Sequence, residues 1–201
     1  MEFSHVVRHR RMVRRYDPDR EVPEQVLRAC FENAVRAPSA GFSQGWDFVL
    51  LTRAPERDAF WAATAEDPDE PDAWLAGMTT APVVIVCCSH KDAYLERYTE
   101  PDKGWGDREE ARWPVPYWDV DTGMASLLIL LTAVDQGLGG CFIGVPAECH
   151  DDVHDSFGIP RDRTIVGAVT LGYEVPGPRS PSLRRHRRTA DEVVHRGRFG
   201  S

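Results

Sequence analysis

The sequence predicts an α+β fold in which helices and strands form packed layers. Strand patterns occur at WDFVLLT (46–52), APVVIVCCS (81–89) and RTIVGAVTLGYE (163–174), and segments with helical periodicity lie between them. These segments do not follow the regular strand–helix alternation of βαβ units, so a doubly wound parallel sheet is not expected. A chain of 201 residues is long enough to bury a substantial core, and we expect one domain over residues 1–201.

The first half of the chain predicts three helices and two strands. Residues 3–11 fit a short helix, and residues 22–37 fit a longer one that begins near Pro23 and presents an apolar face. A strand over 46–52 and a helix over 55–65 follow, and then a polar loop broken by proline at 66–72. The unbroken β-branched run at 81–89 predicts a strand buried on both faces.

The second half begins with an acidic, aromatic segment at about 90–116 that is interrupted by prolines. Such a segment is either a lid over a site or an excursion that packs by itself. Residues 119–137 form the most apolar helix pattern, so we expect this helix to be central and to end at Gly137 or Gly139. A short strand at 140–144, a helix at 146–158 and the strand at 163–174 complete the fold, with an extended tail from about 176.

Charge is unevenly distributed along the chain. The formal net charge is −8, yet residues 1–20 hold six arginines and residues 179–198 hold seven, whereas residues 54–111 hold fourteen acids and five basic residues. Only two of the 24 basic residues are lysine. A GC-rich genome would favour arginine codons in this way. The alternative is that two distant arginine clusters meet on one anionic group.

Composition also bears on where the protein acts. The longest apolar run, SLLILLTAV, is about half the length of a membrane span. The N-terminal residues lack the apolar core of a secretion signal, and five cysteines without CxxC spacing suit a reducing compartment. We therefore expect a cytoplasmic protein with no membrane partner. The negative net charge and the lack of a stacking module argue against a nucleic-acid partner, although the arginine-rich ends leave that alternative open.

Several catalytic motifs are missing or misplaced. GFSQG at 41–45 has the GxSxG spacing, but it precedes a predicted strand, whereas a nucleophile elbow follows a strand and precedes a helix; there is also no P-loop. The run GLGGCFIG follows a helix and precedes a strand, which is the reverse of the order in a dinucleotide-binding fold. CHDDVH places His150 and His154 four residues apart, a spacing that can hold zinc, but no further ligand pair accompanies it. A solvated helix start with acids in its first turn is the simpler interpretation.

The run RHRRMVRRYD holds Arg10, Arg11 and Arg14 where a first helix ends. Guanidinium groups bind a phosphate monoester through paired hydrogen bonds, so this run is a candidate phosphate site. A solvated basic helix would have the same composition. The run continues into RACFENAVRAPSAGFSQGWDFVLL, where a helix stops at a loop of small residues and a strand begins.

Taken together, RRYDPDREVPEQVLRACFENAVRAPSAGFSQGWDFVLL and DVDTGMASLLILLTAVDQGLGGCFIGVPAECHDDVHDSFGIPRDRTIVGAVTLGY resemble the flavin-dependent nitroreductase family, and RRHRRTADEVVH resembles its basic tail. About two-thirds of the chain is covered, in the right order. The resemblance implies a three-layer α/β/α fold with a central mixed, mostly antiparallel sheet. It also implies a homodimer with FMN at the subunit interface, with the helix at 118–136 as the expected contact.

The resemblance assigns the cofactor site residue by residue. Arginines 10 and 11 and the main chain at residue 12 would hold the phosphate and ribityl end, and Arg14 would lie beside the N1–O2 edge of the flavin. The loop at 38–40 would come from the partner subunit, residues 141–144 would pass the ring, and Arg188, or else Arg187 or His186, would close on the phosphate. The full expected set is Arg10, Arg11, Met12, Arg14, Pro38, Ser39, Ala40, Gln44, Cys141, Phe142, Ile143, Gly144 and Arg188.

The implied activity is an FMN-dependent oxidoreductase that uses NADPH or NADH to reduce nitroaromatic, quinone or similar flat electrophilic substrates by ping-pong hydride transfer through flavin N5. No side-chain nucleophile is needed, since the flavin carries the chemistry. A dehydrogenase or dehalogenase of the same family, or a flavin-binding protein without turnover, are the alternatives. Four departures from the family pattern bear on substrate class: Met12, Phe42, Gly45 and Ile143.

Overall fold

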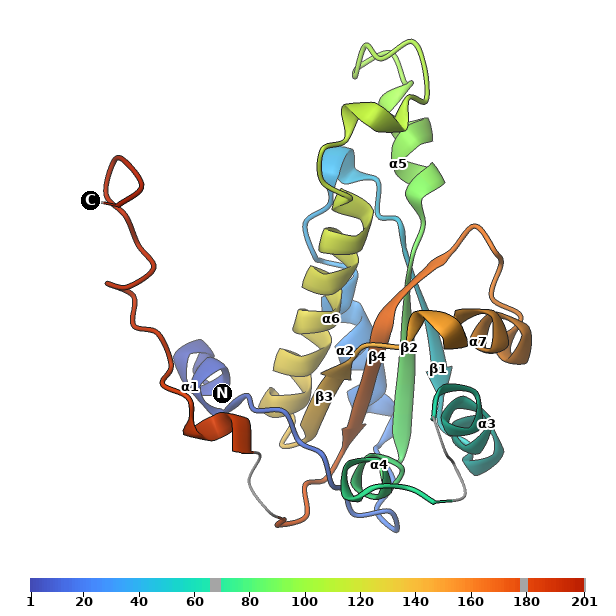
Figure 1. The fold of residues 1–201 in the computed structure, drawn as a ribbon, viewed down its shortest axis with the longest axis vertical. Helices are drawn as coiled ribbons and strands as arrows, with labels where there is room; N and C mark the ends of the chain where they lie inside the picture. Colours follow the sequence, from blue (N-terminus) through green and yellow to red (C-terminus); the bar gives the residue numbers. More distant parts are fainter. Residues whose placement is uncertain (66–69, 178–180, 201) are drawn as a thin grey trace.

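A computed structural model of the chain describes residues 1–65, 70–177 and 181–200. Its centre is a sheet of four strands in the order β1-β2-β4-β3, and each adjacent pair is antiparallel (Figure 1). The strands are β1 (Trp46–Leu51), β2 (Val83–Ser89), β3 (Gly139–Ile143) and β4 (Thr164–Gly172). A parallel bridge between Met12 and Gly140 adds the N-terminal segment to this sheet. The predicted α+β fold with a mostly antiparallel sheet is confirmed.

Helices cover both faces of the sheet and make three layers. On one face lie α2 (Glu24–Ala34) and α6 (Tyr117–Asp135), and on the other lie α3 (Ala54–Thr64), α4 (Ala73–Met78) and α7 (His150–Phe157). Side chains alternate along β2, so Ile85 packs with α2 and α6 while Val86 packs with α3 and α7. Every residue of β2 is buried, as its sequence predicted.

Some boundaries and elements differ from the sequence-based expectation. The first helix, α1 (Phe3–His9), ends two residues early, and α2 ends at Ala34. Helix α4 was not predicted; it has six residues, and the Asp72 carboxylate caps it by accepting the Leu75 N–H at 2.7 Å. The predicted loop at 66–72 falls largely on residues 66–69, which lie outside the described residues.

The segment at 90–116, called the excursion below, contains α5 (Lys91–Tyr98) and a 3-10 turn at Glu110–Arg112. It projects beyond one end of the sheet (Figure 1). Its aromatic side chains pack on one another around Trp113, whose ring contacts those of Tyr94, Tyr98 and Trp105. The excursion therefore has a small aromatic core of its own. Residues 181–200 form a tail that extends away from the layers (Figure 1).

Helix α6 is the longest helix and lies at the centre of the fold. By length and composition alone this helix could span a membrane, but half of its 18-residue apolar stretch is buried inside the protein. Ala125, Ile129 and Ala133 are fully buried in the core shared with α2. This burial is the pattern of a core helix, in agreement with the central position predicted from sequence.

Candidate functional site

The N-terminal arginines lie on a segment, residues 10–15, that is attached to the edge of β3. The Val13 N–H donates to the Gly140 carbonyl at 3.0 Å, next to the bridge between Met12 and Gly140. A Cβ at Gly139 would fall 2.6 Å from a methyl carbon of Val13, so only glycine allows this approach. The GLGG run therefore serves as a docking point for the arginine segment.

Tyr16 holds the other end of the arginine segment in place. Its hydroxyl donates to the Val13 carbonyl at 2.7 Å and lies 2.8 Å from the Thr170 hydroxyl of β4. Its main-chain N–H donates to Thr80 at 2.9 Å. Burial raises the pKa of Tyr16 well above its usual value, so the phenol stays neutral and keeps its proton for Val13. Tyr16 was not among the predicted site residues, although its place after the arginines could have indicated it.

The three arginines have different surroundings. Arg11 forms an ion pair with Glu174, and its Nε donates to the same carboxylate at 3.1 Å. Within residues 1–65, 70–177 and 181–200, Arg10 and Arg14 form no ion pair with a carboxylate. Burial raises the pKa of the Cys141 thiol, and the nearby guanidinium groups of Arg14 and Arg10 oppose that rise. Two uncompensated cations thus lie beside β3, where an anion can bind.

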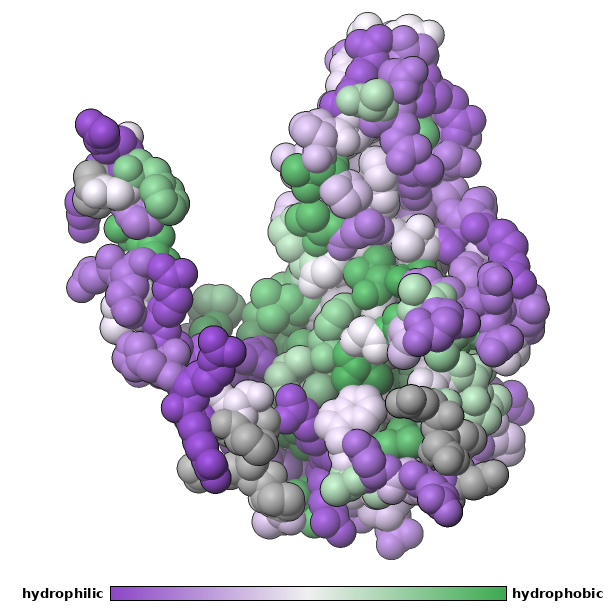
Figure 2. Space-filling model, in the orientation of Figure 1, coloured by the Kyte–Doolittle hydropathy of each residue, from purple (hydrophilic) through white to green (hydrophobic). Residues whose placement is uncertain are grey.

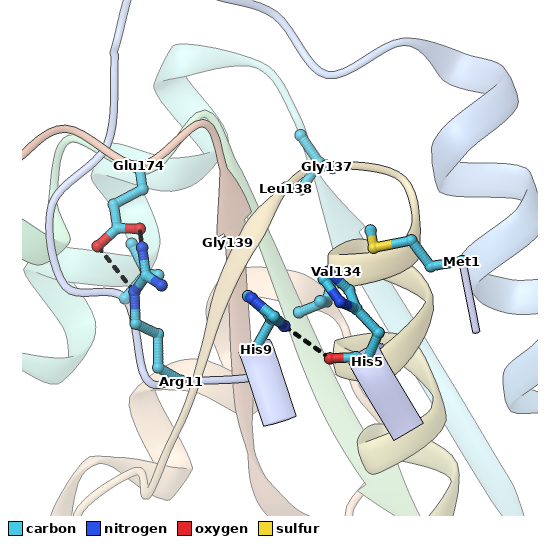
Figure 3. A pocket seen from close by; sticks show the side chains of 10 residues that line it. Met1, His5, His9, Arg11, Val134, Gly137, Leu138, Gly139 and Glu174 are labelled. Atoms are coloured by element: carbon cyan, nitrogen blue, oxygen red, sulfur yellow. Dashed lines mark hydrogen bonds and ion pairs between the residues drawn. The ribbon is translucent and has the colours of Figure 1, made fainter. Parts of the chain in front are cut away.

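A cavity of about 230 Å³ is lined by Arg11 and Val13 of the segment, whereas Arg10 and Arg14 are not among its lining residues. Figure 3 shows His5, His9 and Arg11 around it, with Arg11 turned toward Glu174. The His9 ring contacts the His5 carbonyl at 2.8 Å. Arg11 thus faces this cavity and already has a carboxylate partner, whereas Arg10 and Arg14 have no carboxylate partner among the described residues.

Strand β3 has an open edge beyond Gly140. It pairs with β4 on one side, and among the described residues its other side pairs only at Gly140. Successive residues of a strand direct their N–H and C=O groups to opposite sides. Since Gly140 faces Val13, Phe142 also directs its main chain to this open edge, and exposed Gly144 follows. The strand edge beside Arg10 and Arg14 is thus formed by Cys141, Phe142, Ile143 and Gly144.

The small-residue loop, defined here as residues 38–45, lies elsewhere. Its main chain is fixed by the Ala40 N–H, which donates to Asp121 at 2.8 Å, and by the Gln44 N–H, which donates to the Ser39 hydroxyl at 3.1 Å. Phe42 and Gln44 have φ values of 58° and 52°, which are unusual for residues with side chains. Such strained positions occur mainly at functional sites. The Phe42 side chain is 74% exposed.

The glycines of the small-residue loop are explained by its contact with α5. A Cβ at Gly41 would fall 2.6 Å from the Tyr98 ring, and one at Gly45 would fall 2.5 Å from the Tyr94 ring. Gly41 also has a φ of 63°, which favours glycine. Gly45, which departs from the family pattern, is therefore explained by the Tyr94 ring that packs against it. The loop lacks bulky side chains in part because the excursion lies against it.

The two groups of predicted residues lie at opposite ends of α6 in one chain (Figure 1). The small-residue loop contacts Asp121 near the start of α6, whereas the arginine segment contacts Gly140, beyond the end of the helix at Asp135. A rise of 1.5 Å per residue puts about 20 Å between Asp121 and Asp135. Pro38, Ser39, Ala40 and Gln44 are thus not brought to Arg10, Met12, Arg14 and Cys141 within a single chain.

Arg188 lies in the tail, where its guanidinium donates to the Glu192 carbonyl at 2.5 Å. In the part of the chain that the structure describes, no contact joins Arg188 to Arg10 or Arg14, and Figure 1 shows the tail leading away from the sheet. Its predicted contact with a phosphate stays a prediction.

The zinc alternative at CHDDVH is not supported by the described residues, which contain no group of three potential ligands. The His154 ring is buried with its Nδ1 3.0 Å from the Ile159 carbonyl, while His150 contacts the Val145 carbonyl at 3.1 Å. The main-chain partners of both histidines lie outside α7, one on each side of it.

Comparisons with known proteins agree with the observed fold. The sequence model of the Nitroreductase family matches residues 7–173. A protein named NADH dehydrogenase from Thermus thermophilus is 30% identical over 92% of this chain and 91% of its own, and a 4-nitrobenzoate reductase from Nocardioides is 29% identical over 86% and 80%. The crystal structure of a nitroreductase family protein from Streptococcus pneumoniae has a TM-score of 0.72 at 21% identity, covering 96% of this chain and 99% of the other. The chain belongs to the nitroreductase family.

Proposed function

We propose that the protein is an FMN-dependent oxidoreductase that takes electrons from NADH or NADPH and reduces a flat electrophilic substrate such as a nitroaromatic compound or a quinone. Membership of the nitroreductase family and the names of its relatives support an oxidoreductase. The observation that carries the choice of FMN is the pair of uncompensated guanidinium groups, Arg10 and Arg14, beside the open edge of β3.

The residues present fit FMN. Arg10 would bind the phosphate, and the Met12 main chain would lie beside it. Arg14 would place positive charge near the pyrimidine edge of the ring, where negative charge develops on reduction. Phe142 or Gly144 would donate a main-chain N–H to the ring. When bound, FMN supplies hydride transfer between the nicotinamide and the substrate, so the chain itself needs no nucleophile.

Two copies of the chain are required by this proposal. The small-residue loop is separated from the arginine segment by most of the length of α6, so it reaches the cofactor only from a second subunit. In a twofold dimer each interface residue meets the equivalent surface of the partner, and antiparallel α6 helices would bring the loop of one copy to the arginines of the other.

An exposed apolar surface fits this second copy. On α6 the side chains of Tyr117, Val120 and Leu127 are 41%, 42% and 46% exposed, and on α1 Phe3 is 71% exposed. Figure 2 shows hydrophobic side chains along the flank of the molecule that carries α6. Apolar surface of this kind is typical of homodimer interfaces, and a partner would also offer the tail with Arg188 a place to bind.

The excursion is proposed to select the substrate. In this arrangement its aromatic core lies against the small-residue loop, and exposed Phe42 would add a flat apolar wall to the site. A nitroaromatic or quinone ring would stack on such side chains. The family's common Asn is replaced here, so recognition would depend on ring contact more than on a polar group.

The test begins with the visible spectrum of the purified protein after incubation with FMN. We expect flavin absorption bands that remain after gel filtration, and bleaching under anaerobic conditions on addition of NADH or NADPH. Addition of a nitroaromatic compound or a quinone should then restore the bands. A protein that takes up no FMN contradicts the proposal, and one that binds FMN but is not bleached by either nicotinamide is a flavin-binding protein without this activity.

Variants test the residues that carry the argument. Arg10→Ala combined with Arg14→Ala should abolish retention of FMN, because it removes both guanidinium groups that lie without a carboxylate partner beside β3. Arg28→Ala is the matched control, since Arg28 is an exposed arginine on α2 and belongs to neither half of the site. Equal FMN retention in the double variant and the control would show that the phosphate binds elsewhere.

A further inference from the structure

The most unusual buried group outside the predicted site is the carboxylate of Asp121 on α6. Its residue is 2% exposed, and among the described residues no cation forms an ion pair with it. One carboxylate oxygen accepts two hydrogen bonds, from the Ala40 N–H at 2.8 Å and from the Tyr94 hydroxyl at 2.9 Å. Burying a carboxylate without a cation beside it costs folding free energy, so Asp121 is a candidate for a specific role.

The two donors come from two different parts of the proposed site. Ala40 belongs to the small-residue loop, and Tyr94 belongs to α5 of the excursion. Tyr94 is fully buried, and its ring packs against both Trp113 and Trp118. Asp121 is therefore the point where the loop, the aromatic core of the excursion and α6 meet.

The loop needs such an anchor because its main chain is strained. Phe42 and Gln44 both have positive φ, a conformation that persists only when the surroundings impose it. The bond from Ala40 to Asp121 fixes the start of this strained stretch, and Arg97 of α5 fixes its middle by donating to the Gly41 carbonyl at 2.9 Å. The second anchor comes from the excursion itself, and the first shares its acceptor oxygen with Tyr94 of the excursion.

We propose that Asp121 is a positioning residue that couples the excursion to the small-residue loop, so that the loop adopts its cofactor-binding shape only while Tyr94 is in place. The inference rests on the proposed function for its effect on FMN. Any movement of the excursion that withdraws the Tyr94 hydroxyl loosens the hold of Asp121 on Ala40, and the loop then binds the flavin less well.

Hydrogen exchange of the flavin-free protein tests the coupling independently of the cofactor. The variants are Asp121→Asn, which removes the charge, and Tyr94→Phe, which removes only the hydroxyl. Asp119→Asn is the matched control, because Asp119 lies on the same helix but accepts from the Ser89 hydroxyl at 2.5 Å and not from the loop. We expect amide exchange in residues 38–45 to become faster in the two test variants and to be unchanged in the control.

Flavin titration tests the consequence. We expect the Kd for FMN to rise about tenfold in Asp121→Asn and in Tyr94→Phe, with the double variant little weaker than either one, because both changes remove one shared interaction. The control should keep the wild-type Kd. A purely structural role would lower the urea midpoint without changing the Kd measured well below unfolding.

Three results overturn the inference. Unchanged exchange at residues 38–45 in both test variants would show that Asp121 does not hold the loop. Faster exchange with an unchanged Kd would show that the loop's shape does not matter for FMN. A wild-type protein that binds no FMN would refute the proposed function, and with it the role of Asp121 at the cofactor, even if exchange still reported the contact with Ala40.

Discussion

Replacing Gly77 with alanine tests how tightly the arginine segment is held. Gly77 lies in α4, and a Cβ there would fall 2.3 Å from the Arg14 carbonyl oxygen, whereas ordinary contacts begin near 3.4 Å. Helix and segment would have to separate by about 1 Å, and overpacking of this kind costs about 1–3 kcal/mol. Alanine returns up to about 1 kcal/mol of helix propensity, so we expect a net loss of about 1–2 kcal/mol in the free energy of unfolding.

The assay is urea unfolding followed by tryptophan fluorescence, together with a titration of FMN into the folded variant. Because the Arg14 main chain must move, we expect weaker FMN binding in addition to lower stability. Gly106→Ala is the control, since a Cβ at Gly106 meets nothing within 4 Å. A Gly77→Ala protein with the stability and FMN affinity of the control would refute the claim that α4 holds the arginine segment in place.

Three further predictions follow from other contacts. Tyr16→Phe should lower the free energy of unfolding by about 1–3 kcal/mol, because the Val13 carbonyl loses its buried partner; equal urea midpoints for variant and wild type would contradict this. Arg97 holds the pKa of Asp102 to about 2, below its usual 3.8, so the contribution of this carboxylate to stability is present above pH 4 and is lost as the pH falls toward 2. Asp102→Asn should therefore show a flatter dependence of stability on pH in that window, measured by acid titration of tryptophan fluorescence. Cys149 is partly exposed while the other four cysteines are buried, so a thiol reagent should label one cysteine rapidly in the native protein and none rapidly in Cys149→Ser.

The layers of the fold could be predicted from sequence because burial leaves a clear pattern. The β-branched run of β2 and the apolar α6 each indicate an element with neighbours on several sides, and both occupy the predicted place. Helix α4 could not be predicted in this way, since six residues hold less than two helical turns of periodicity. Helix α5 was not predicted, because the acids, aromatics and prolines of the surrounding segment obscure its helical periodicity.

The site was only partly predictable for a similar reason. The arginine segment and the edge of β3 come together within one chain, while the role of Arg10, Arg14 and Cys141 in binding a flavin stays a prediction. Asp121 was missed because its partners are set by tertiary packing: Ala40 lies 81 residues away in the sequence. An acid among the apolar residues of α6 was the one available indication. In the proposed dimer the meeting of loop and arginines depends on a second copy, which no pattern within a single chain describes.

Complementation between two defective variants tests the central claim, a flavin site shared by two copies, most directly. Arg14→Glu disables the arginine half and Pro38→Trp fills the loop half, so each variant alone should bind no FMN. When the two are mixed and allowed to exchange subunits, half of the dimers are mixed and each holds one intact site, which restores about one quarter of the wild-type flavin per chain. Recovery to that level is the predicted result. No recovery, in a mixture shown to contain mixed dimers, would mean that the loop and the arginines do not share a cofactor.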